Sequence, residues 1–131
     1  MEFALLAALS YGISYTIYSW SADRASFSYI MFYGSIYCAI ITAPFALREK
    51  FNPDVLKAIA VERSVWLIAS LFIYLSIKKI GVAATSTFES VYPFFVALFV
   101  AMIYKERPQL SLLIGGIFIF AGISIIAYNK K

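Results

Sequence analysis

The chain has 131 residues, of which 63% are hydrophobic and 14% charged, and its formal net charge is +4. A soluble domain usually has about 25% charged residues, and one this small could not bury so much apolar surface in its core. The absence of histidine and the single cysteine, Cys38, exclude the usual zinc sites, Ser-His and Cys-His catalysis and an intrachain disulfide.

The remaining solvent for such a chain is a lipid bilayer. Its apolar runs are long and continuous, which favours helices over the short alternating strands of a membrane barrel. Lys and Arg lie in the gaps between these runs, so they carry information about topology and do not indicate a nucleic-acid partner. We predict an all-α integral membrane protein of the cell membrane without metal or other cofactor. Its single domain over residues 1–131 has five spans, at residues 3–22, 27–47, 60–79, 82–104 and 109–128.

The first two spans are joined by only a few residues, so they should form a tight antiparallel hairpin. Residues 3–22 contain no charged side chain and have no Lys or Arg before them. Their length and the missing basic residues favour a retained span over a cleaved signal peptide.

The third span is preceded by a strong helix start. Asn52 is a good N-cap, Pro53 suits the first helical position, and Asp54 is favoured by the helix dipole. Residues 51–62 then form either a short interfacial helix or the outer end of the third span. Only fourteen uncharged residues separate Arg63 from Lys78. That is about 21 Å of helix, so the helix must start earlier and its lysines must snorkel to cross a core of about 30 Å.

The fourth span carries a carboxylate, Glu89, well inside its apolar run. Insertion of a charged residue near a helix centre costs about 2.5–3.5 kcal/mol. Pro93 lacks the N–H that would bond to the carbonyl oxygen of Glu89, so carboxylate and carbonyl acceptors gather within one turn. Thr85, Glu89, Tyr92 and Pro93 share one helix face. We predict that this face binds a proton or the solute; the alternative is that Glu89 only makes a structural hydrogen bond.

Polar side chains on the first three spans are candidate neighbours for a solute. Several stack at helical spacing, and tyrosines bind aromatic or cationic organic molecules by stacking and cation–π contact. Ordinary packing between helices is an equal alternative for these side chains. The candidates are Tyr11, Ser14, Tyr18, Tyr33, Tyr37, Ser70 and Tyr74.

Small residues mark the fifth span. Ser111, Gly115 and Gly122 recur at spacings of four and seven, which places them on one face, and Gly116 lies beside them. Such faces let helices approach closely. The contact is made either within the chain or with a second subunit.

The connections on the two sides of the membrane carry nearly equal numbers of cations, six and five. This balance permits insertion in both orientations, and hence an antiparallel dimer of inverted copies. The alternative is one orientation, fixed by the long segment between the second and third spans. The first side has Arg48, Lys50, Lys57, Arg63, Lys105 and Arg107; the second has Arg24, Lys78, Lys79, Lys130 and Lys131.

Tyr92-Pro93, residues 97–107 and the glycine-bearing residues 113–122 resemble the EamA-type domain of the drug/metabolite transporter superfamily. Residues 8–14 are similar to that family's first helix, and Lys105 stands where the family usually has glycine. The resemblance covers essentially the whole chain. Family members usually carry two five-helix units in inverted orientation, so this chain resembles one half of such a transporter. The related small multidrug resistance proteins have an essential glutamate in the first helix, whereas residues 3–22 contain no acid.

The resemblance implies a transporter of small organic metabolites or drugs that works by alternating access as a homodimer, or as a heterodimer with a similar short chain. Proton coupling through Glu89 is a further hypothesis. The alternative function is that of a non-transporting membrane subunit that scaffolds or regulates a partner. We do not expect an enzyme, because one buried acid without histidine or a second acid makes no catalytic constellation.

Overall fold

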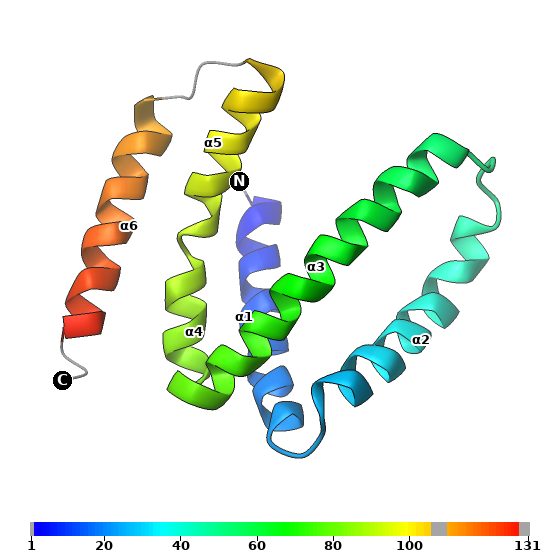
Figure 1. Ribbon diagram of the computed structural model, residues 1–131, viewed down its shortest axis with the longest axis horizontal. Coiled ribbons are helices and arrows are strands. Elements are labelled where there is room, and N and C mark those ends of the chain that lie inside the picture. The colour runs from blue at the N-terminus through cyan, green and yellow to red at the C-terminus, as the bar shows by residue number, and fades with distance from the viewer. Residues whose placement is uncertain (1, 106–109, 129–131) are drawn as a thin grey trace. The chain divides into compact units, whose positions relative to one another are not determined.

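All regular structure in the described part of the chain is α-helical, as predicted. The computed structural model describes residues 2–105 and 110–128 (Figure 1). They divide into two compact units, an N-terminal unit (Met1–Val82) and a C-terminal unit (Ala83–Lys131). The helices are α1 (Glu2–Ala22), α2 (Phe27–Ala46), α3 (Pro53–Ile80), α4 (Val82–Glu89), α5 (Tyr92–Tyr104) and α6 (Leu110–Tyr128).

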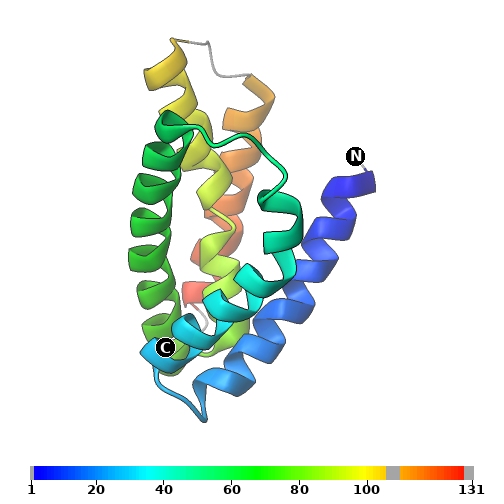
Figure 2. The same cartoon turned by 90° about the vertical axis from the view of Figure 1, so that its right-hand side faces the viewer.

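In the N-terminal unit, side chains of α3 hold the turn between α1 and α2. The Tyr74 hydroxyl donates a hydrogen bond to the Ala25 carbonyl (3.2 Å), and its ring lies 5.7 Å from that of Phe27. The Lys78 ammonium lies 3.7 Å from the Asp23 carboxylate. Helix α1 accordingly contacts both α2 and α3 (Figure 2).

Helix α3 is one continuous helix of 28 residues that begins at Pro53. The Asn52 side-chain oxygen accepts hydrogen bonds from the backbone N–H groups of Asp54 (3.0 Å) and Val55 (3.3 Å), as expected for an N-cap. Residues 51–62 therefore do not form a separate interfacial helix, and the third helix starts earlier than residue 60. At about 42 Å, it is longer than the hydrocarbon core is thick.

The predicted continuous helix over residues 82–104 is interrupted between α4 and α5. Ser90 and Val91 form a turn, with N–H donors reaching back to the carbonyls of Thr87 (3.2 Å) and Phe88 (3.4 Å). The missing N–H of Pro93, and the bulk of its ring against the preceding turn, explain why regular helical bonding stops here.

In the C-terminal unit, α5 and α6 run side by side in opposite directions (Figures 1 and 2). The Phe94 ring packs edge-on to Phe120 with centroids 5.6 Å apart. A β-carbon added to Gly116 would lie 2.8 Å from a carbon of the Phe94 ring, whereas one added to Gly115 or Gly122 would meet nothing within 4 Å. Gly116 therefore serves packing within the chain, while the face with Gly115 and Gly122 is open.

This difference gives a matched pair of variants on α6. Gly116→Leu should lower the free energy of unfolding by about 1–3 kcal/mol, because Phe94 must move to admit the new side chain. In the monomer, Gly115→Leu should leave this free energy unchanged or raise it by up to about 1 kcal/mol, since leucine is the better helix former. Thermal unfolding in detergent compares the two; equal destabilisation would contradict the packing of Phe94 on Gly116.

Apolar side chains are distributed as expected for a chain that faces lipid. Large ones such as Phe3, Phe45 and Phe118 are 86%, 70% and 74% exposed. Three described stretches are long and apolar enough to cross a membrane: Phe27–Ala46, Pro53–Ile80 and Val82–Tyr104. Helix α1 has the length but carries many Ser and Tyr, and the apolar part described in α6, Ile114–Ile125, is shorter. The count of five spans stays a prediction.

Candidate functional site

A cavity of about 420 Å³ lies among the three helices of the N-terminal unit. This volume falls within the range of small-molecule sites. Helix α1 contributes Tyr11, Ser14, Tyr15 and Tyr18; α2 contributes Ile30, Met31, Gly34, Ser35 and Cys38; α3 contributes Arg63, Trp66, Ser70 and Ile73.

The cavity brings together four of the residues singled out from the sequence: Tyr11, Ser14, Tyr18 and Ser70. Ser70 is buried, with 5% of its surface exposed. The Tyr18 hydroxyl oxygen is also buried, and it makes no hydrogen bond within residues 2–105 and 110–128. Together with Ser35 of α2, they place hydroxyl groups from all three helices around this space.

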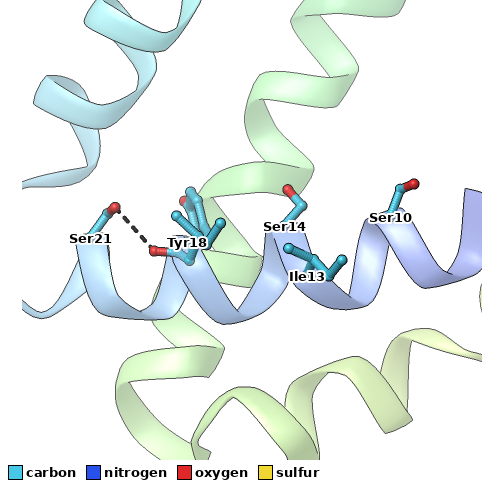
Figure 3. Close-up of a pocket in the computed structure, with 6 residues that line it drawn as sticks. Ser10, Ile13, Ser14, Tyr18 and Ser21 are labelled. Carbon is cyan, nitrogen blue, oxygen red and sulfur yellow. Dashed lines mark hydrogen bonds between the residues drawn. The ribbon is translucent and has the colours of Figure 1, made fainter.

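Tyr18 also borders a shallower groove along one side of α1. Figure 3 shows Ser10, Ile13, Ser14, Tyr18 and Ser21 projecting from successive turns around this groove of about 390 Å³. The Ser21 hydroxyl donates a hydrogen bond back to the carbonyl of residue 17 (3.1 Å), so it is satisfied within the helix. Ser14 and Tyr18 are the residues that this groove shares with the cavity.

Three predicted site residues lie elsewhere in the N-terminal unit. Tyr33 borders a separate hollow beside the turn between α1 and α2, where its ring lies 4.5 Å from that of Tyr29. Tyr37 is 66% exposed and lines none of the cavities described here. Tyr74 is committed to the turn through its bond to Ala25. The predicted tyrosines therefore lie in different places. Tyr11 and Tyr18 line the cavity, Tyr33 borders the hollow, Tyr37 is exposed, and Tyr74 holds the turn.

Sequence reasoning missed Arg63, Trp66 and Cys38 as cavity residues. Arg63, Trp66, Ser70 and Ile73 follow one another at steps of three and four, so they share one face of α3. This spacing was visible in the sequence. The charge of Arg63 is typical of a connection between spans, which is where the sequence alone places this residue.

The other predicted group belongs to the C-terminal unit. Thr85 is buried, with 2% exposure, and Glu89 is half-buried as the last residue of α4, directly before the helix interruption. Tyr92 and Pro93 begin α5, and Tyr92 is 66% exposed. The structure therefore places the carboxyl group of Glu89 at a break in regular backbone, where helix-end carbonyl groups also lie.

Ligand chemistry at these places is that of hydroxyls, aromatic rings, a carboxyl group and one guanidinium. Within the described residues, no cluster of three or more His, Cys, Asp or Glu side chains could hold a metal ion.

Comparison with protein-family models matched residues 2–128 to the family described as EamA-like transporter family. Comparisons with curated proteins and with solved structures gave no match.

Proposed function

The chain belongs to the EamA-like transporter family, and on this premise we propose that it carries small organic metabolites or drugs across the cell membrane. Its cavity of about 420 Å³, lined by α1, α2 and α3, is the observation that supports this function most directly. Tyr11, Ser14, Tyr18 and Ser70 supply hydrogen-bonding groups, and Trp66 supplies an aromatic surface. Such a combination suits a small solute with a polar group and an apolar body.

We further propose that Glu89 couples transport to a proton gradient. A carboxyl group can take up and release a proton, and irregular backbone inside a membrane is tolerated mainly where it lines a cavity or is buried in protein. Glu89 ends α4 at such an irregularity. Thr85, Tyr92 and Pro93 are the other residues of this proposed site.

A working dimer is proposed for two reasons. The chain resembles one unit of transporters that contain two, and the open face with Ser111, Gly115 and Gly122 suits close helix contact. The partner is either a second copy, inserted in the opposite orientation, or a similar short chain. Alternating access would then arise as the two subunits of the dimer rock against each other.

Dual orientation predicts that a sidedness reporter fused to the C-terminus gives signal from both sides of the membrane. The near-equal cation count is the reason; Arg107, Lys130 and Lys131, which enter it, lie outside the described residues. Signal from one side only would exclude an antiparallel homodimer. It would leave the heterodimer with a similar short chain.

Solute binding can be tested by thermal unfolding of the purified protein in a panel of organic solutes. A solute present at about 100 times its dissociation constant should stabilise the folded protein by about 2.7 kcal/mol. Trp66→Ala removes the largest side chain of the cavity, so the same solute should stabilise this variant less than the wild type. A panel without any stabilising solute would favour the non-transporting membrane subunit.

A further inference from the structure

The cavity in the N-terminal unit is electrostatically one-sided. Among the described residues that line it, Arg63 is the charged one, and none of them is a carboxylate. From the tyrosines alone, the sequence indicates aromatic or cationic organic solutes, bound by stacking and by cation–π contact. The Arg63 side chain is 66% exposed, so it lies at the mouth of the cavity, where its permanent positive charge attracts an anionic solute.

Arg63 has donor capacity left for a ligand. Its Nε lies 3.1 Å from the Glu62 carboxylate, and its guanidinium carbon lies 5.7 Å from the centroid of the Trp66 ring. The part of the chain that the structure describes offers neither Nη group a hydrogen bond. Both side chains of this ion pair are well exposed, and Glu62 lies outside the cavity lining, so the pair is weak and a ligand can compete with Glu62 for Arg63.

The cavity has two different ends. Helices α1 and α3 run in the same direction while α2 runs against them (Figure 1), so Arg63, Tyr11 and Cys38 lie toward one end and Tyr18, Ile30 and Ile73 toward the other. Ser70 is seven positions after Arg63, which corresponds to about 10 Å along α3. Trp66 lies between them on the same face.

We propose that this cavity selects an organic anion: a carboxylate or phosphate held by the Nη groups of Arg63, with an apolar or aromatic body of about 10 Å lying along Trp66 toward Ser70. The planar guanidinium presents paired donors that match either anion, and its distance from the hydroxyl end sets the length of the solute. This proposal rests on the proposed transport function, because it names the solute class for that cavity.

Cys38 makes the charge measurable without knowledge of the solute, because it is the chain's single cysteine and shares the cavity with Arg63. In detergent, a sulfonate-bearing methanethiosulfonate should modify Cys38 faster than a trimethylammonium-bearing one, on the order of tenfold after normalisation to a free thiol. Arg63→Gln should abolish this preference, and Arg63→Lys should retain most of it. Arg48→Gln, which removes an arginine outside the cavity, should change nothing, and Cys38→Ser gives the zero-labelling baseline. An unchanged ratio in Arg63→Gln would overturn the proposal.

A second measurement asks which ligands occupy the space. Indole-3-acetate, indole-3-acetamide and tryptamine share one ring and differ in charge. The carboxylate should protect Cys38 from a neutral maleimide at a concentration about tenfold lower than the other two, and Arg63→Gln should remove the difference. Phenyl phosphate tests the phosphate form. If phosphatidylglycerol vesicles protect Cys38 without any added solute and phosphatidylcholine vesicles do not, the anion is a lipid headgroup.

These outcomes separate the anion site from transport. If the three indoles protect Cys38 equally, or if none of them protects it, anion selection is overturned and transport of another solute stays open. Charge-selective protection that depends on Arg63, in a protein that moves no solute, would support the anion site and contradict the transport function.

Discussion

Glu89→Gln should abolish accumulation of solute driven by a proton gradient while it leaves the protein folded and assembled. Glutamine matches the size of glutamate and keeps hydrogen-bonding groups at the end of α4, but it cannot carry a proton. For one proton exchanged per solute, a gradient of one pH unit sustains a concentration ratio of about tenfold. The variant should hold a ratio of about one in the same proteoliposomes.

Exchange of solute across the membrane without a gradient distinguishes two roles for Glu89. If Glu89 carries only the proton, exchange should persist in Glu89→Gln; if it also contacts the solute, exchange should be lost too. Glu2→Gln is the matched control, because Glu2 is an exposed acid in the first turn of α1. Full gradient-driven accumulation by Glu89→Gln would dispose of proton coupling through this residue.

Gly81→Ala should lower the free energy of unfolding by about 1–3 kcal/mol. Gly81 joins α3 to α4 with φ 84° and ψ 162°, a backbone conformation that is essentially restricted to glycine. Its N–H also donates to the carbonyl of Ile77 (2.9 Å), so the residue is held in this conformation at the end of α3. A β-carbon would meet no neighbour within 4 Å, which means that the loss comes from backbone strain alone.

The control for this variant is Gly12→Ala. Gly12 lies inside α1, and a β-carbon added there also meets nothing within 4 Å. Because alanine is the better helix former by about 1 kcal/mol, this variant should be neutral or stabilising. Thermal unfolding in one detergent compares both. Equal stability of Gly81→Ala and the wild type would show that the junction relaxes to an ordinary conformation.

Hydropathy and local capping rules were sufficient for the helical class and for most helix starts. Asn52 caps α3 as its side chain predicts, because an N-cap depends only on residues next to it in the sequence. Pro93 predicted the loss of one backbone bond but not a two-residue turn at Ser90 and Val91. The tighter bonds that replace the helical ones depend on how the neighbouring residues relax, which a proline alone does not specify.

The candidate site was harder to predict, because a helix face says which residues point together but not what they meet. Tyr74 stacks with Ser70 along α3, yet it bonds to Ala25, 49 residues away, and belongs to the turn. Arg63 shows the reverse error: its charge suggested an external connection, whereas α3 brings it to the cavity. Ser111, Gly115 and Gly122 are predicted to share one contact face, with Gly116 beside it. Only the position of Phe94 shows that Gly116 is occupied and that Gly115 is open.

Lys105 connects the family resemblance to backbone geometry. It stands where related sequences usually have glycine, and its φ of 56° is the left-handed conformation that glycine adopts most easily. The following residues 106–109 lie outside the described part of the chain.

Solute counterflow in proteoliposomes tests the transport function most directly. Vesicles that contain the reconstituted wild-type protein are loaded with an unlabelled solute that stabilises it, then diluted into a trace of the labelled solute. Transport predicts a transient accumulation of label inside these vesicles, absent from protein-free vesicles and from vesicles loaded without solute. If folded, solute-binding protein produces no counterflow for any stabilising solute, the chain is not a transporter by itself.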